Sequence, residues 1–180
     1  MMNLIEKPEH MTSLSGDRLV PKTHDRIVFR GLVDSLEADV IEAQVLAHER
    51  GQGSEGGDLC AQLGEVLAYL RDIMSAEVKE MPLAPPFLFG MEDEEIRRAS
   101  LGPGNGILPP EAMLPSYTQG ALAARINTLR TKVRELELFA VKVFGPGAEP
   151  DQYPREDIIL ALNRLSSALW WLFCRQIMGT

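Results

Sequence analysis

The chain is poor in cysteine, with two thiols, Cys60 and Cys174, that lie far apart in its 180 residues. Because neither belongs to a Cys-x-x-Cys pair, we expect no cysteine-based metal site, a reducing compartment, and two buried, inert thiols. None of the three histidines stands in a Glu-x-x-His pattern, which argues against a di-iron carboxylate bundle. Gly-x-Ser-x-Gly and His-Glu-x-x-His motifs are also missing, so the common hydrolase chemistries are set aside.

Long apolar runs and a basic surplus are missing as well. No apolar run approaches the roughly 20 residues of a membrane-spanning helix, and the N-terminus lacks the basic and apolar blocks of a signal peptide. The formal net charge is −8 at pH 7, whereas nucleic-acid binders usually carry a basic surplus or stripe. We therefore expect no membrane or nucleic-acid partner, and an anionic ligand would need a few placed cations.

Apolar residues at helical spacing are what the chain does contain. They predict five helices, at about 25–49, 59–78, 91–100, 118–144 and 154–178. No segment shows sustained alternation of apolar and polar residues, so no strand is expected. The sequence therefore predicts an all-α, five-helix bundle in one domain over 13–180, after a weakly ordered tail at 1–12.

A charged line runs beside the apolar stripe of the fourth predicted helix. Arg130, Arg134 and Glu137 stand at i, i+4 and i+7, so they share one helix face. Two interpretations stay open: a solvated, salt-bridged face, or side chains directed at a ligand. The planar donor fork of arginine suits phosphate and carboxylate groups. Lys132 lies off this line, and we expect it to be solvated.

Two polar residues stand among apolar ones in other helices. Asn163 is a poor helix former that must find hydrogen-bond partners if it is buried. It either bonds a neighbouring helix or contacts a ligand through its amide, and the sequence leaves both open. Asp34 is placed to pair with an arginine of another helix, and such pairs are usually architectural.

A short polar turn precedes the first predicted helix. Ser15, Gly16 and Asp17, followed by Lys22, are residues that bind phosphate through backbone N–H groups and an ammonium group. The same residues would equally make a plain loop, and they match neither a Walker A sequence nor a dinucleotide fingerprint.

Four blocks in this order carry a family resemblance: LVPKTHDRIVFRGLVDSLEADV, LRDIMSAEVKEMPL, NTLRTKVRELE and ALNRLSSALWW. Together they resemble the corrinoid adenosyltransferases of ethanolamine utilisation and, more distantly, the propanediol-utilisation type of ATP:cob(I)alamin adenosyltransferase. The resemblance covers about 13–178, and its two C-terminal blocks are the most specific. It implies a five-helix bundle that forms a homo-oligomer, a trimer in the propanediol type, with active sites between subunits.

The reaction that the resemblance implies moves the 5′-deoxyadenosyl group of ATP to the cobalt of reduced cobalamin. Cob(I)alamin attacks the ribose C5′, adenosylcobalamin forms, and triphosphate leaves; Mg²⁺ would accompany ATP. The implied setting is the cytoplasm, beside a bacterial microcompartment, with a cobalamin reductase or an adenosylcobalamin-dependent lyase as partner. The alternative is a non-catalytic bundle that binds a corrinoid or a nucleotide, or that scaffolds an ethanolamine-utilisation microcompartment.

The resemblance also implies roles for individual residues. Arg134 and Asn163 match ATP-contacting residues, and Glu137 matches an acidic residue of the same catalytic site. Asp34 and Arg130 match a salt bridge across the subunit interface. Lys22 matches a lysine near the phosphates, and the turn at Ser15, Gly16 and Asp17 partly resembles a phosphate loop.

Two features of the family have no clear counterpart in this chain. Longer ethanolamine-type relatives carry an N-terminal module with clustered cysteines that binds a metal, and no such cluster is present here, so no metal site is expected. The family also uses an aromatic residue to displace the lower ligand of cobalt. The candidates for that residue are Phe87, Phe89, Tyr117 and Trp170.

Overall fold

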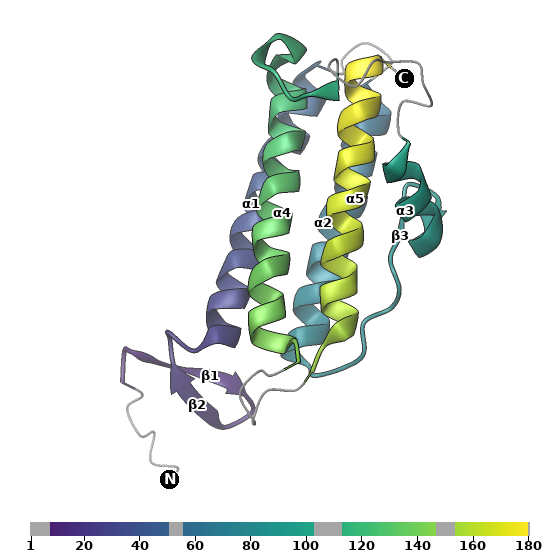
Figure 1. Cartoon of the computed structure of the whole chain (residues 1–180). Helices are drawn as coiled ribbons and strands as arrows, with labels where there is room; N and C mark the ends of the chain where they lie inside the picture. The colour runs from purple at the N-terminus through teal and green to yellow at the C-terminus, as the bar shows by residue number, and fades with distance from the viewer. Residues whose placement is uncertain (1–7, 51–55, 103–112, 147–153, 180) are drawn as a thin grey trace.

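Four long helices lie side by side in the computed structural model, and a short fifth helix packs on one of them (Figure 1). The structure describes residues 8–50, 56–102, 113–146 and 154–179. The helices are α1 (Asp25–Arg50), α2 (Gly56–Val78), α3 (Asp93–Leu101), α4 (Gly120–Phe144) and α5 (Glu156–Met178). Each lies within three residues of its predicted limits. The all-α, five-helix bundle expected from the sequence is therefore confirmed.

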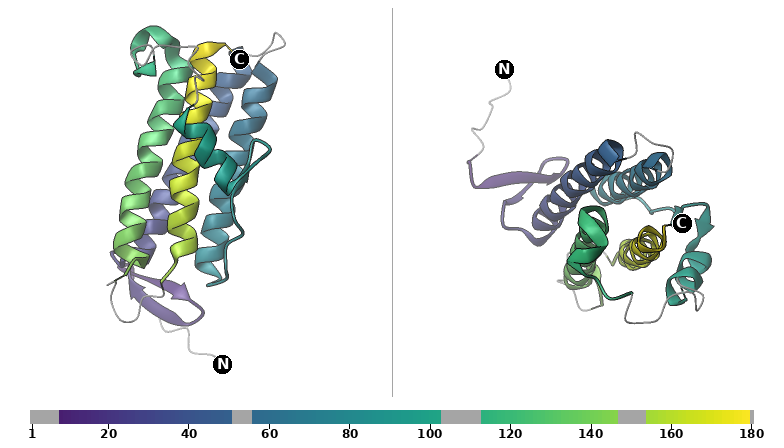
Figure 2. Two further views of the ribbon diagram at one scale, coloured as in Figure 1. Left: turned by 45° about the vertical axis from the view of Figure 1, so that its right-hand side comes forward. Right: turned by 90° about the horizontal axis from the view of Figure 1, so that it is seen from above.

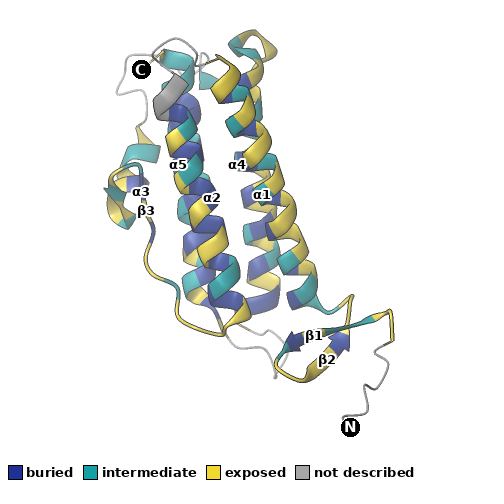
Figure 3. Ribbon diagram, turned by 180° about the vertical axis from the view of Figure 1, so that it is seen from behind, coloured by how far each residue is buried: buried dark blue, intermediate teal, exposed yellow. Residues whose placement is uncertain are grey.

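The apolar stripes of the long helices meet in one core. On α1 the buried positions recur at intervals of three and four residues: Arg26, Phe29, Val33, Leu36, Val40, Ala43 and Ala47. α1 packs on α2 and α4, and α4 packs on α5, so the buried faces turn inward (Figure 3). Seen from above, α5 lies between α4 and α3 (Figure 2). Burial of these stripes, at about 25 cal/mol per Å² of apolar surface, is the main force that holds the helices together.

Helix α5 is the most apolar of the long helices. Among the described residues it is the one helix whose length and composition would suit a membrane span, contrary to the expectation from the sequence. Half of its most apolar window is buried inside the bundle, against α4 and α3. The central helix of a bundle meets the same criteria because it is apolar on most sides.

Two short β-hairpins were not expected from the sequence. Strands β1 (Met11–Ser15) and β2 (Arg18–Pro21) pair antiparallel, and β1 begins inside the stretch predicted to be weakly ordered. Residues 1–7 of that stretch lie outside the described residues. The hairpin strands bury one side chain each, Leu14 and Val20. One buried residue per strand is too few to produce a recognisable alternation of apolar and polar residues.

The second hairpin joins β3 (Phe87–Leu88) to β4 (Met91–Glu92) through a tight turn. Both turn residues have positive φ, 57° at Phe89 and 74° at Gly90. A turn with two such residues normally favours Asn-Gly, so Phe89 holds an unfavourable backbone conformation.

A buried ion cluster joins α1 to the end of α2. The Glu77 side chain is fully buried, and its two carboxylate oxygens accept hydrogen bonds from Arg26 Nε and Arg30 Nε, each at 2.5 Å. Arg26 also donates to the half-exposed Glu80 at 2.7 Å. Burial alone would lower the pKa of Arg26, but the bonds to Glu80 and Glu77 raise it above its usual value. Sequence spacing does not predict this cluster, because its members are about 50 residues apart.

Arg155 fastens the start of α5 to the end of α2. Its guanidinium donates to the carbonyl oxygens of Ala76 at 3.1 Å and Met81 at 2.9 Å, and it pairs with Asp157. Its backbone N–H donates to the Phe144 carbonyl at 3.1 Å, which holds the two ends of the α4–α5 connection together. Arg155 is thus a second donor to the Ala76 carbonyl, which also accepts from the Met81 N–H at 3.0 Å, and it bonds the Met81 carbonyl after the end of α2.

Candidate active site

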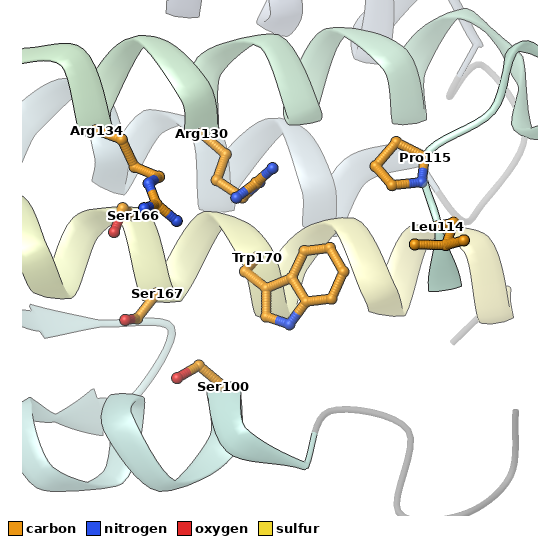
Figure 4. Close-up of a pocket in the computed structure, with 8 residues that line it drawn as sticks. All are labelled: Ser100, Leu114, Pro115, Arg130, Arg134, Ser166, Ser167 and Trp170. Carbon is orange, nitrogen blue, oxygen red and sulfur yellow. The ribbon is translucent and has the colours of Figure 1, made fainter. Parts of the chain in front are cut away.

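A pocket of about 440 Å³ opens between α4, α5 and the end of α3. Its lining is Ser100, Leu114, Pro115, Arg130, Arg134, Ser166, Ser167 and Trp170. Arg130 and Arg134 come from α4 and extend toward α5, where the two serines and Trp170 lie (Figure 4). Two cations and three hydroxyl groups therefore face one cavity, a composition that suits an anionic ligand with a flat, apolar part.

Arg130 is half-buried and held in place from two sides. Its Nε donates to Asn127 Oδ1 at 3.1 Å, and its guanidinium carbon lies 5.4 Å from the ring centre of Trp170. Trp170 in turn stacks on Phe173, with 5.4 Å between ring centres. Burial, and then the positive charge of Arg134, lower the pKa of Arg130 below its usual value. An arginine remains charged at neutral pH even so, and the pocket keeps its positive character.

Arg134 is exposed and makes no hydrogen bond or ion pair with any side chain that the structure describes. Its five N–H donors are therefore available to a ligand in the pocket. The first interpretation of the charged line, a solvated and salt-bridged face, therefore fits the exposure of Arg134, but Arg130 and Arg134 form no salt bridge among the described residues.

Glu137 and Asn163 form a pair one helical turn from the pocket. Asn163 Nδ2 donates to Glu137 Oε1 at 2.8 Å, and Asn163 Oδ1 accepts from Arg164 Nη1 at 2.7 Å. Asn163 thus bonds a neighbouring helix, as one interpretation expected. Neither Glu137 nor Asn163 lines the pocket, but the hydroxyls of Ser166 and Ser167, which do, donate to the Asn163 carbonyl. The contact of the Asn163 side chain with ATP stays a prediction.

The remaining residues with implied polar roles lie away from the pocket in a single chain. Asp34 is exposed on α1 and has no ion pair among the described residues. Lys22 is largely exposed, with its Nζ 3.9 Å from a Glu9 carboxylate oxygen. The turn at Ser15–Asp17 connects β1 to β2, where Gly16 has φ of 52° and its carbonyl accepts from Ser13. This hairpin lies at the end of the bundle where α1 begins and α4 ends (Figure 1).

The aromatic candidates separate clearly. Trp170 lines the pocket, whereas Phe87 and Tyr117 are exposed by 63% and 91% and do not. Phe89 stacks on Trp171, with 5.6 Å between ring centres, and the guanidinium group of Arg175 lies over the Trp171 ring.

Some side chains near the site were not singled out from the sequence. Arg164, beside Asn163, forms an ion pair with Asp93 at the start of α3, and Ser100 comes from the other end of that helix. The pair of Arg164 and Asp93 has no local sequence signature, because the two residues are 71 positions apart. The expectation for Lys132 was wrong in part, because its Nζ pairs with Asp39 at 2.5 Å while the side chain stays partly exposed.

Across the described ranges, no three His, Cys, Asp or Glu side chains gather in a way that could hold a metal ion. Cys174 is buried, and burial raises the pKa of its thiol to about 11, so it is inert near neutral pH. Cys60 is only half-buried, which differs from the expectation for it.

The model of the cobalamin adenosyltransferase family matches residues 4–176. The chain belongs to this family. Among curated relatives, it is 34% identical to the corrinoid adenosyltransferase EutT of Salmonella typhimurium over 167 residues, and 34% identical to that of Escherichia coli K12 over 165 residues. These alignments cover 93% and 92% of this chain.

The curated relatives are longer proteins: the chain spans 58% of the length of each. Among solved structures, the fold resembles a variant of the PduO-type ATP:corrinoid adenosyltransferase of Lactobacillus reuteri, complexed with cobalamin and ATP. The TM-score is 0.69 at 18% identity, and the alignment covers 94% of this chain and 91% of that one. At this identity the likeness supports the family's fold, which agrees with the match along the chain.

Proposed function

We propose that the chain is an ATP:corrinoid adenosyltransferase that transfers the 5′-deoxyadenosyl group of ATP to the cobalt of cob(I)alamin and releases triphosphate. The observation that carries the proposal is the pocket in which Arg130 and Arg134 face Trp170 and three serines. Membership of the cobalamin adenosyltransferase family and the names of its relatives support it.

The charges of the pocket suit the leaving group of this reaction. As the C5′–oxygen bond breaks, negative charge grows on the triphosphate, and fixed cations near it lower the barrier. Arg134, which has no hydrogen bond or ion pair with the described residues, can direct its donors at this charge, and Arg130 adds a second cation beside it. Mg²⁺ would accompany ATP as part of the substrate. Trp170, held between Arg130 and Phe173, adds an apolar wall against which the flat adenine or corrin ring can pack.

The site is completed, in our proposal, by a second copy of the chain in a trimer. Asp34 and Arg134 have no ion-pair partner within the described residues, and Lys22 and the Ser15–Asp17 turn lie far from the pocket. A neighbouring copy that placed its α1 beside α4 would pair its Asp34 with Arg130 and bring its Lys22 toward the triphosphate.

Mixed oligomers test the shared site. Lys22→Ala and Arg134→Ala chains, each impaired alone, are expected to regain part of the activity when they are unfolded, mixed and refolded together. A hybrid interface then combines Arg134 of one chain with Lys22 of the other. The control is each variant refolded by itself. A mixture no more active than the sum of the two would contradict a site built from two copies.

The reaction itself is tested by mixing the protein with ATP and chemically reduced cobalamin without oxygen. We expect the absorbance spectrum to change to that of adenosylcobalamin, with one triphosphate released per product, and no change when ATP is omitted. Tight cobalamin binding without an ATP-dependent product would favour the non-catalytic alternative instead. The proposal also places the enzyme in the cytoplasm, with a cobalamin reductase as the source of the reduced corrinoid, and cell fractionation with co-purification checks both.

A further inference from the structure

Arg164 connects the asparagine of the site to the helix on the far side of α5. Its Nε donates to Asp93 Oδ1, and its Nη1 donates to Asn163 Oδ1 at 2.7 Å. The side chain of Arg164 is 12% exposed and that of Asp93 is 29% exposed, so solvent screens this pair only in part. The planar guanidinium fork fixes both partners at once, because its two donors keep a constant geometry.

The orientation of the Asn163 amide follows from this contact. Oδ1 accepts from a cation on one side, and Nδ2 donates to the Glu137 carboxylate at 2.8 Å on the other. The reverse orientation would place an N–H group against Arg164 and an oxygen against a carboxylate, so both bonds would be lost. Asn163 keeps one amide hydrogen and one oxygen lone pair unused in these bonds, which is the capacity needed for a ligand.

Asp93 is itself held firmly. It is the first residue of α3 and lies inside the Glu92–Glu95 capping box, where each of these two side chains accepts from the backbone N–H of the other residue. A negative charge in the first turn also suits the helix dipole. α3 packs along α5, and Ser100 at its other end lines the pocket. The position of α3 is thereby linked both to the pocket and to the Asn163 amide.

We propose that Asp93 is a positioning residue for nucleotide binding, which acts through Arg164 to hold the Asn163 amide in its ligand-binding orientation. This inference rests on the proposed function, since it assigns the nucleotide to Asn163. Without the carboxylate at position 93, Arg164 is free to turn away, and the amide then loses the partner that fixes its oxygen.

Asp93→Asn is expected to raise KM for ATP by about tenfold, the size usual for coupling within one hydrogen-bond network, and to change kcat less. The matched control is Glu94→Gln, which removes the same charge from the same turn of α3. Glu94 is 67% exposed and lies 3.9 Å from Arg97, so its loss is expected to leave KM unchanged. Arg164→Lys keeps the charge but loses the fork, and it should reproduce the effect of Asp93→Asn.

A double-mutant cycle separates positioning from a general loss of structure. In the Asn163→Ala background, Asp93→Asn should raise KM by less than about twofold, because the residue it acts through is gone. The inference would be overturned if KM for ATP in the double variant rose by the product of the increases in Asp93→Asn and Asn163→Ala. It would also be overturned if KM were unchanged in both Asp93→Asn and Arg164→Lys. Calorimetric titration with ATP alone measures the dissociation constant of ATP for the same variants, without the corrinoid. If the wild-type chain binds ATP but forms no adenosylcobalamin, the proposed reaction is contradicted and the role of Asp93 in nucleotide binding can still be measured. If the wild-type chain does not bind ATP, both the proposed reaction and the role of Asp93 are contradicted.

Discussion

Arg134→Ala is expected to lower kcat for adenosyl transfer by about 10²- to 10³-fold, the loss typical when one fixed donor to a developing negative charge is removed. Arg134 lines the pocket and has no hydrogen bond or ion pair among the described residues. Its substitution therefore breaks no hydrogen bond or ion pair among the described residues, and helicity and thermal stability should stay close to those of the wild type. A loss of activity without a loss of structure would assign the residue to the reaction.

The measurement is steady-state turnover with ATP and reduced cobalamin, paired with circular dichroism of the same samples. Lys132→Ala is the control, because it removes one positive charge two residues away on α4. Lys132 pairs with Asp39 and does not line the pocket, so near-normal activity is expected. Turnover of Arg134→Ala within about twofold of the wild type would remove Arg134 from the site.

Glu77→Ala is expected to lower the free energy of unfolding by about 3–5 kcal/mol, the cost typical of removing one partner from a buried ion pair. The substitution leaves the guanidinium groups of Arg26 and Arg30 without the carboxylate between them. Arg30 Nη2 is already a buried donor with no partner among the described residues, and the half-exposed Glu80 would be left as the carboxylate partner of Arg26.

Thermal unfolding followed by circular dichroism measures this effect, and a fall in Tm of about 10 °C is expected for a chain of this size. Glu80→Ala is the matched control, since it removes the half-exposed partner of Arg26. An exposed pair contributes about 0–1 kcal/mol, so Tm should change little. Equal shifts in Tm for Glu77→Ala and Glu80→Ala would show that the burial of Glu77 does not determine how much it contributes to stability.

The four long helices were predictable because each repeats its apolar positions over many turns, whereas the nine-residue α3 buries only Ile96 and was predicted from its acidic start and basic end. Phe29, Val33, Leu36 and Val40 on α1 are one example, and all four are buried. The hairpins were not predictable, because a strand of two to five residues with one buried side chain carries almost no periodic signal. The positive φ of Phe89 in particular runs against what its residue type favours.

The candidate site was predictable only in part. Arg130 and Arg134 could be placed together from their spacing on one helix, and the structure puts both in one pocket. The bond between Asn163 and Glu137 joins two helices, and sequence spacing gives no information about such pairs. Asp34 and Lys22 were candidates from their residue types, as the partner of an arginine and as a phosphate-binding cation, and the resemblance assigned them to the site. A single chain does not bring them to the pocket, as expected if residues of a second copy complete it.

The order of the helices along the chain also has a consequence for how the core assembles. α1 packs on α2 and α4 packs on α5, so each pair is a helical hairpin formed from consecutive segments. The seam between α1 and α4 joins the two hairpins, and exposed ion pairs such as Arg125–Glu42 and Lys142–Asp25 cross it. Much of the core is therefore closed by contacts that are near in sequence, and such low contact order is the property that accompanies fast folding.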